Sequence, residues 1–236
     1  MSQKENFYVY LIVHQLRAPL AGMKWVFNSL LCGSAGEIPE EQKYLLEKGK
    51  LANDKMISLV NDLLDAAKIE QGKFVFNFFA GSLKDLIKKK IGELAEFASV
   101  RGVKIIFKGE EGFAAPVMMD AEKIGFVIQN LVDNAVKYSK DGDEVEISID
   151  YGKFDGYATV KVEDNGIGIP ASQKDKIFEK FFRADNAAGI ESAGSGLGLF
   201  IAKSIVEKHG GKIWFSSKGG EEGKGTVFWF TLPIVA

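Results

Sequence analysis

The chain has 236 residues, 46% of them hydrophobic, and a formal net charge of −2. This is long enough for one or two domains with their own cores, and the composition is ordinary for a soluble globular protein. The near-neutral charge gives no electrostatic reason to expect nucleic acid or an anionic membrane as a partner. A single cysteine, Cys32, excludes an internal disulfide framework and fits a reducing, cytoplasmic compartment.

No segment is expected to cross or enter a membrane. The longest early apolar run, Tyr8 to Val13, is far too short to span a bilayer, and no signal-peptide pattern precedes it. The chain starts directly in a helical pattern, which is compatible with its being the catalytic part of a longer protein whose sensor region is missing.

Two segments with helical periodicity make up the first part of the chain. Apolar residues recur at spacings of three and four over residues 7–31 and 45–70, and Gly33, Gly36 and Pro39 interrupt the pattern. Two helices with a short connection predict an antiparallel hairpin. A lone hairpin leaves much of its apolar stripe wet, so we expect a homodimer that forms a four-helix bundle. The predicted stripe consists of Val13, Leu16, Leu20, Met23, Phe27 and Leu30, then Leu45, Gly49, Ala52, Met56, Leu59, Leu63 and Ala66.

His14 is one of only two histidines in the sequence. It follows Val13 by one position, so a step of about 100° around the helix turns it away from the core. Pro19 removes a backbone donor and is expected to bend the helix locally. Taken alone, His14 is best interpreted as an ordinary surface histidine.

From about Phe74 the pattern changes to short strands alternating with helices. Ser82 and Asp120 are expected to cap helices that run to about Val100 and to Tyr138. The mixed order predicts an α+β sandwich with helices on one face of a sheet, and the domain boundary falls at 70–73, giving domains 1–71 and 72–236. Strands are predicted over 74–79, 104–107, 145–149, 157–162, 212–216 and 226–232, with Gly152 and Gly156 in one turn and a further helix over 199–209.

Three polar side chains share one side of the helix expected over 120–138. Asn130 and Asn134 are four residues apart, and Lys137 follows three residues later. Two amides and an ammonium group that face one way could hold hydrated Mg²⁺ and polyphosphate oxygens. A polar outer helix face is the alternative, although asparagine is a poor helix former and two mid-helix copies invite an explanation.

Two glycine clusters follow. Asp164-Asn165-Gly166-Ile167-Gly168 comes directly after a strand, where a carboxylate could accept a hydrogen bond from an exocyclic amine; a hairpin turn is the alternative. Gly194, Gly196 and Gly198 precede a helix, and their amides suit an anion such as phosphate.

The segment between the clusters, residues 184–193, is small, polar and glycine-bearing, which predicts a mobile loop that acts as a lid. Phe178, Phe181 and Phe182 precede it as lid anchors or core aromatics. Arg183 could reach a terminal phosphate and stabilise developing charge.

These motifs, in this order, resemble the sensor histidine kinases of two-component signalling over nearly the whole chain. The resemblance implies an all-α dimerisation and phosphotransfer hairpin (1–71) followed by a Bergerat-type ATP-binding α+β sandwich (72–236). The matching segments are His14–Leu20 (phosphoacceptor box), Asn130–Tyr138 (N box), Asp164–Gly168 (first glycine box), Phe178–Arg183 (F box), Gly194–Leu199 (second glycine box), His209–Ile213 and Gly225–Pro233.

The resemblance also implies roles for individual residues. His14 takes the γ-phosphoryl group of ATP on a ring nitrogen, and the group then passes to an aspartate of a response-regulator receiver domain. Asp164 reads the adenine amine, Asn134 binds Mg²⁺ assisted by Asn130, and Arg183 contacts the phosphate end. The implied catalytic residues are His14, Gln15, Asn130 and Arg183, and the implied nucleotide-binding residues are Asn134, Lys137, Tyr138, Asp164, Gly166, Gly168, Gly194, Gly196, Leu197, Gly198 and Thr226.

Two positions depart from the family's usual pattern. Gln15 stands where an acidic residue usually follows the histidine, and an amide cannot take up the ring proton. We therefore expect slower autophosphorylation than a Gln15→Glu variant would show. Ala18 stands where Thr or Asn often positions water, so phosphatase activity toward a phosphorylated receiver is expected to be weak or absent.

Two other functions compete with this interpretation. The first is a dimeric scaffold that binds nucleotide without turning it over, motivated by Gln15. The second is another ATPase of the same superfamily, of the chaperone or topoisomerase type; the hairpin that bears His14, the short chain and Asn130 in place of a water-activating glutamate argue against it. Whether transfer runs within one subunit or between two depends on the handedness of the 32–38 connection.

Overall fold

The computed structural model describes residues 3–34, 36–109, 115–154, 156–190, 194–217 and 225–235. The chain divides into two compact units, Met1–Phe74 and Val75–Ala236, which are considered separately below. Within these ranges, no helix is both long enough and apolar enough to span a bilayer.

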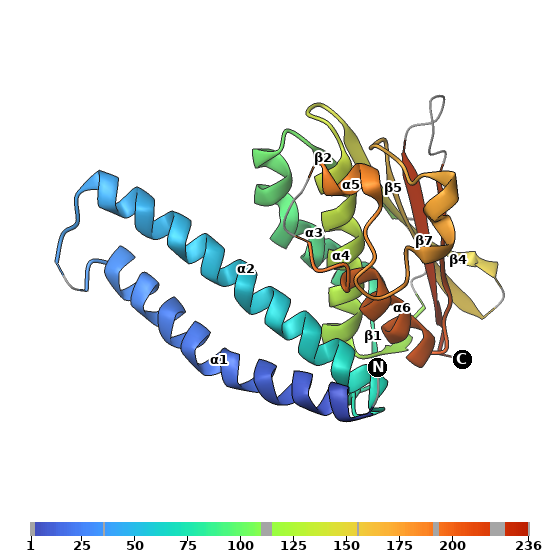
Figure 1. Cartoon of the computed structure of the whole chain (residues 1–236). Coiled ribbons are helices and arrows are strands. Elements are labelled where there is room, and N and C mark those ends of the chain that lie inside the picture. Colours follow the sequence, from blue (N-terminus) through green and yellow to red (C-terminus); the bar gives the residue numbers. More distant parts are fainter. Residues whose placement is uncertain are drawn as a thin grey trace. The chain divides into compact units, whose positions relative to one another are not determined.

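The first unit is a helical hairpin (Figure 1). Helix α1 runs from Gln3 to Leu31 and contains Pro19, and helix α2 runs from Glu40 to Glu70. Pro39 is the N-cap residue of α2, and Glu40 and Glu41 supply negative charge to the helix start. The predicted hairpin is therefore present, with a first helix that begins earlier than expected.

The two helices meet along one narrow line of residues. Val13 and Leu20 of α1 are buried, as are Leu64 and Ala67 of α2. Asn53 is also buried, and its amide nitrogen donates to the Leu20 carbonyl at 3.1 Å. This contact between side chain and backbone fixes how far α2 can slide along α1.

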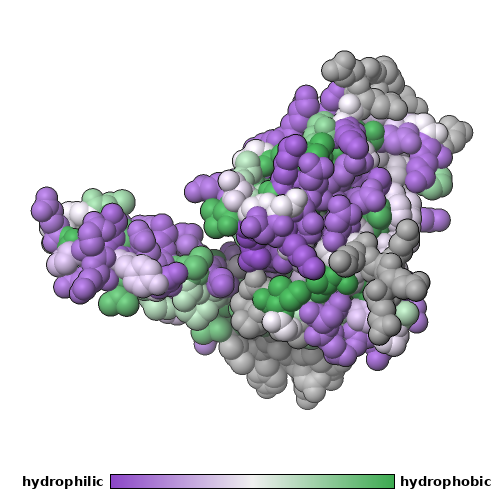
Figure 2. All heavy atoms as spheres, turned by 90° about the horizontal axis from the view of Figure 1, so that it is seen from above, coloured by the Kyte–Doolittle hydropathy of each residue, from purple (hydrophilic) through white to green (hydrophobic). Residues whose placement is uncertain are grey.

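The apolar stripe predicted for α2 lies mostly outside that line. Leu45, Met56 and Leu59 are exposed, whereas Ala66 of the predicted stripe is buried, together with Asn53, Leu64 and Ala67, which the stripe did not include. Figure 2 shows apolar side chains, in green, among the polar ones on the surface of the hairpin. The stripe therefore has two faces, one used inside the hairpin and one left uncovered. The uncovered large apolar residues are Leu16, Met23, Trp25 and Val26 on α1 and Leu45, Leu51, Met56 and Leu59 on α2.

The second unit is built on a mixed five-stranded sheet in the order β2-β4-β5-β7-β6, in which only β2 and β4 are parallel. A separate small pair joins β1 and β3 in antiparallel register, with Phe79 opposite Met119. The strands are β1 Phe79–Gly81, β2 Lys104–Gly109, β3 Val117–Met119, β4 Glu144–Phe154, β5 Tyr157–Asp164, β6 Ile213–Ser217 and β7 Thr226–Pro233.

Three helices cover one face of the sheet, as Figure 1 shows, and the predicted α+β sandwich is confirmed. They are α3 Leu83–Val100, α4 Ala121–Tyr138 and α6 Gly198–Lys208. Ser82 and Asp120 cap α3 and α4 as expected, since each side chain accepts backbone N–H groups of the first turn. The core lies between sheet and helices, where Val160 and Phe230 are fully buried against residues such as Ile128.

Some predicted elements are wrong in detail. The strand expected over 74–79 is confined to Phe79–Gly81, because the rings of Phe76 and Phe78 pack on His209 and the Asn77 N–H bonds to a carboxylate. Gly152 lies inside β4, at a register irregularity, rather than in the turn. Three short elements were not predicted: β3, the 3-10 helix η1 Ala171–Lys176 and the one-turn helix α5 Asp185–Ala188.

Candidate functional site: a nucleotide-binding arrangement in the second unit

The two predicted asparagines lie side by side on α4. The Asn134 amide donates to the Asn130 side-chain oxygen at 3.3 Å, and both residues are half-buried. Lys137 does not join them in this structure, because its ammonium group pairs with Asp133 one turn earlier. The asparagine pair thus offers amide oxygens of the hard type that Mg²⁺ prefers, while Lys137 would have to exchange partners to reach a phosphate.

Asp164 ends β5 as a buried carboxyl group. Its Oδ1 accepts the N–H of Gly166 at 2.9 Å and the N–H of Thr226 at 3.1 Å. Burial raises the pKa of Asp164 to about 6, and the two backbone donors oppose this shift. Because both backbone bonds use Oδ1, Oδ2 is the oxygen through which the carboxylate could accept a ligand's amine.

The first glycine cluster is fitted against the end of α4. The Ile167 N–H donates to the Tyr138 carbonyl at 3.1 Å. A Cβ on Gly166 would lie 2.4 Å from that same oxygen, so no other residue fits there without a backbone shift. Gly168 adopts a φ of +68°, a conformation that glycine tolerates best. Tyr138 thus contributes its carbonyl, and the cluster is held beside the helix that carries Asn134.

The second glycine cluster packs on the same helix. A Cβ on Gly198, the first residue of α6, would lie 2.0 Å from the Asn130 amide nitrogen. Gly196 has a φ of +67°, and its Cβ would lie 2.7 Å from the Phe181 carbonyl carbon. Leu197, between them, is buried. Close approach to the Phe181–Phe182 backbone therefore requires glycine at position 196, and glycine at position 198 leaves room for the Asn130 amide.

The aromatic residues before Arg183 were predicted to be either lid anchors or core residues, and the structure places them differently. Phe178 is a core residue that contacts the rings of Phe215 and Phe228. Phe181 is 57% exposed and, among the residues described, is the one non-glycine with a positive φ, 62°. The Arg183 guanidinium donates to the Gly194 carbonyl at 3.4 Å, which brings the end of this segment to the second glycine cluster.

The loop predicted over 184–193 contains the helical turn α5 and is not irregular throughout. Asp185 and Gln173 bond reciprocally, and the Asn186 amide donates to the Gly168 carbonyl at 2.9 Å. The start of the segment is thus attached to the first glycine cluster. Residues 191–193 lie outside the described part of the chain, so the predicted lid motion is not tested.

Two residues that bond at the first glycine cluster, Ser217 and Asn186, were not predicted from the sequence. Ser217 accepts the Ile169 N–H at 2.8 Å and donates to the Gly225 carbonyl at 3.0 Å, which joins the first glycine cluster to the start of β7. Asn186 supplies the bond to Gly168 just described. Their partners are far along the chain, and no local pattern marks either residue.

The second unit thus places Asn130, Asn134, Asp164 and both glycine clusters along the C-terminal half of α4: the second cluster lies against Asn130, and the first lies against the Tyr138 carbonyl. Backbone N–H groups, a half-buried amide pair and a buried carboxyl group suit a ligand with an amine at one end and bound phosphates at the other. No group of three or more His, Cys, Asp or Glu side chains that could hold a metal ion occurs among the described residues.

His14 lies in α1 of the first unit, and the predicted direction of its side chain falls outside the described side chains. The neighbouring Gln15 and Ala18 are exposed, and Val13 is buried, as the helical periodicity predicted.

Each of the two units matches a known protein family. Residues 7–72 match the family model "His Kinase A (phospho-acceptor) domain", and residues 119–236 match "Histidine kinase-, DNA gyrase B-, and HSP90-like ATPase". The sensor histidine kinase WalK of Bacillus subtilis is 34% identical over 240 residues, which cover 99% of this chain and 37% of WalK. This chain thus spans little more than a third of that relative's length.

Solved structures agree in fold. Full-length ShkA in complex with AMPPNP superposes with a TM-score of 0.76 over 97% of this chain and 46% of ShkA, at 23% identity. The Acinetobacter baumannii histidine kinase AdeS superposes with a TM-score of 0.64 over 94% of this chain and 98% of that structure, also at 23% identity.

Proposed function

Because the chain belongs to the sensor histidine kinase family, we propose that it transfers the γ-phosphoryl group of ATP to His14 and then to an aspartate of a response-regulator receiver domain. The observation that carries the proposal is the meeting of Asp164, the Asn130–Asn134 pair and both glycine clusters within the second unit. The matched phospho-acceptor segment supplies a histidine in a unit of its own.

Each unit has its own task in this proposal. Residues 1–71 form the dimerisation and phosphotransfer hairpin, and residues 72–236 bind ATP. The uncovered apolar face of the hairpin, with Met23, Leu45 and Met56 among its members, is the surface on which a second copy would complete a four-helix bundle.

Within the ATP-binding unit, the carboxylate of Asp164 accepts the adenine amine, and the glycine clusters let backbone amides approach the base and the phosphates. The residues fit a magnesium nucleotide, since Asn134, supported by Asn130, presents amide oxygen to a cation held mainly by phosphates. Bound Mg²⁺ would neutralise charge on the phosphates. Arg183 adds positive charge at the phosphate end once it leaves the Gly194 carbonyl.

The proposed chemistry is one displacement at phosphorus. The lone pair of a neutral His14 ring nitrogen attacks the γ-phosphorus, an N–P bond forms, and the bond from that phosphorus to the bridging oxygen breaks. ADP leaves with the bond electrons, and the proton on the other ring nitrogen is released. Gln15 can orient the ring but cannot hold this proton, which makes the transfer slow.

The proposal also covers what the protein does to its receiver. Ala18 has no hydrogen-bonding side chain with which to place a water molecule against an aspartyl phosphate. We therefore expect weak or absent phosphatase activity. Incubating the purified protein with a phosphorylated receiver tests this, and robust dephosphorylation would contradict it.

The main test uses γ-labelled ATP. The wild-type protein should acquire label that is lost in acid, as a phosphoramidate is, and His14→Ala should acquire none while it still binds nucleotide. A protein that binds ATP and never becomes labelled would be the silent dimeric scaffold. A protein that releases inorganic phosphate at equal rates with and without His14 would be a hydrolase of the wider superfamily.

A further inference from the structure

His209, the second histidine of the chain, is buried, and both of its ring nitrogens are engaged. Nδ1 donates to the Ile205 carbonyl at 2.8 Å, and Nε2 accepts the Asp120 N–H at 3.0 Å. This pair of bonds requires the neutral ring with its proton on Nδ1. Burial lowers the pKa of the imidazole, which keeps it in this form at neutral pH.

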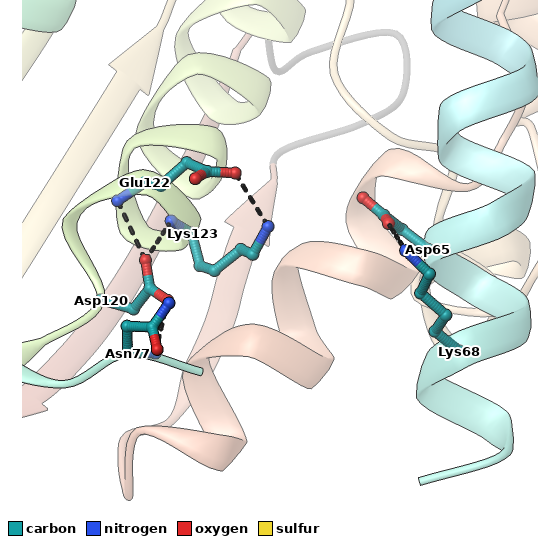
Figure 3. Close-up of polar contacts among 6 residues, drawn as sticks. All are labelled: Asp65, Lys68, Asn77, Asp120, Glu122 and Lys123. Carbon is teal, nitrogen blue, oxygen red and sulfur yellow. Dashed lines mark hydrogen bonds and ion pairs between the residues drawn. The ribbon is translucent and has the colours of Figure 1, made fainter. Parts of the chain in front are cut away.

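Asp120 connects His209, by hydrogen bonds, to the first residues of the second unit. Its Oδ1 accepts the N–H groups of Glu122 and Lys123, both at 3.1 Å, and so caps α4. Its Oδ2 accepts the backbone N–H of Asn77 at 2.9 Å, as Figure 3 shows. One aspartate therefore joins the first turn of α4, the ring of His209 and the segment that enters the unit.

Two aromatic side chains of the same segment close around the ring. The centroid of Phe76 lies 5.5 Å from that of His209, and the centroid of Phe78 lies 4.8 Å away, both in edge-to-face geometry. Such contacts contribute beyond simple burial. Residues 76–78 follow directly after the boundary between the two units, which lies between Phe74 and Val75.

From these contacts we propose that His209 is a positioning residue: with Asp120 it clamps residues 76–78 onto the ATP-binding unit and thereby sets the length of chain between that unit and the His14 hairpin. The clamp is independent of nucleotide binding, but its effect on phosphoryl transfer rests on the function proposed above.

The clamp has a calculable consequence for the connection. Helix α2 ends at Glu70, but the N–H groups of residues 71–73 still donate to carbonyls of its last turns, as Lys73 does to Lys68 at 2.9 Å. With the clamp closed the connecting chain is therefore residues 74–75. With the clamp open, the next fixed point is β1 at Phe79, and the connection becomes residues 74–78. Three further residues add about 10 Å of reach. Because effective concentration falls roughly as the −3/2 power of tether length, the rate of encounter with His14 should drop about four-fold.

The test compares variants that differ only at the clamp. His209→Phe keeps an aromatic ring but leaves the Asp120 N–H without an acceptor, and Asn77→Pro deletes the N–H that Asp120 holds. Asn77→Ala is the matched control, because the bond uses the backbone and not the asparagine side chain. Inserting Gly-Ser-Gly after Lys73 in the wild type lengthens the connection with the clamp and the end of α2 intact.

The first readout is hydrogen exchange in peptides covering residues 76–79, measured on the whole chain. Protection should be lost in His209→Phe and Asn77→Pro and retained in Asn77→Ala and the insertion variant. Protection that survives in both of the first two variants would overturn the clamp. This readout needs no kinase activity, so it remains decisive if the proposed function fails.

The second readout is autophosphorylation kinetics. Both clamp variants and the insertion variant should lose about four-fold in kcat, with the KM for ATP and the nucleotide affinity unchanged. An unchanged kcat would overturn the positioning role. A loss of nucleotide affinity in both clamp variants would also overturn it, because it would show that His209 supports the fold of the ATP site and does not set the connection.

Discussion

The two units of this chain bury their apolar residues to very different degrees. In the ATP-binding unit, a layer of helices closes over the sheet, and Leu83, Val160 and Phe230 are fully buried. In the hairpin, Trp25 is 71% exposed and Leu45 67% exposed, although both lie in well-formed helices. The difference indicates that the first unit is built to be completed by another surface, whereas the second is complete in itself.

The largest expected effect comes from breaking the hairpin's uncovered face. Met56→Lys would place a charge in the proposed dimer interface, where its burial is costly, and should weaken self-association about 100-fold, or about 3 kcal/mol. Analytical ultracentrifugation measures this directly. Val100→Lys, on an exposed site of the other unit, should leave self-association unchanged. Equal behaviour of the two variants would mean that the hairpin does not form the dimer.

The next largest effect is expected from a substitution in the ATP-binding unit. In Gly198→Ala, the new Cβ would overlap the Asn130 amide, so either this side chain turns aside and leaves Asn134 or the second glycine cluster shifts. We expect at least a tenfold loss of nucleotide affinity by calorimetry, and a loss of about 1–3 kcal/mol in the free energy of unfolding. Gly92→Ala is the control: it lies in helix α3 with open space around its Cβ, and it should stabilise the protein slightly.

Lowering the pH should have opposite effects on ATP affinity and on the folding stability of the same unit. The Asp164 carboxyl, with a pKa of about 6 in the free protein, must be ionised to accept the adenine amine, so ATP affinity should fall up to tenfold for each pH unit below 6. The contribution of Asp164 to the free energy of unfolding changes with pH in the opposite direction. The folded state holds this proton more tightly than the unfolded chain does, so Asp164 adds stability as the pH falls from about 6 toward its ordinary value of 3.8. Asp164→Asn should remove both dependences, and a wild-type affinity that is flat across pH 6 would contradict the assigned role.

The smallest effect concerns the exposed residue beside His14. Gln15→Glu supplies a carboxylate that can take up the ring proton, and it should raise the autophosphorylation rate a few-fold without changing nucleotide affinity. Single-turnover labelling measures the rate. A rate that is unchanged or lower in the variant would reject the explanation of Gln15 as a brake.

Sequence periodicity predicted the helices well, because caps such as Ser82 and Asp120 and breakers such as Gly33 act locally. Periodicity could not tell which side of α2 faces α1. Exposed Leu45 and buried Leu64 both fit a helical pattern, and only tertiary packing chooses between them. The strand predicted over 74–79 was wrong for a related reason: its aromatics contact His209, which lies more than a hundred residues away in the sequence.

The candidate site shows the same division. The sequence indicated the asparagine pair and both glycine clusters, because spacing along one helix or one turn is local information. It did not reveal that Gly198 is pressed against Asn130, that Lys137 pairs with Asp133, or that Ser217 and Asn186 hold the first glycine cluster. Each of these depends on which segments the sheet brings together.

The most direct measurement locates the phosphoryl group while nucleotide occupancy is known. The whole protein is incubated with magnesium ATP, occupancy is measured by equilibrium dialysis, and the modified residue is mapped by mass spectrometry at neutral to basic pH. The account predicts modification of His14 in the wild type, and in Asp164→Asn a decrease that parallels the loss of occupancy. An occupied nucleotide site with an unmodified His14 would contradict it.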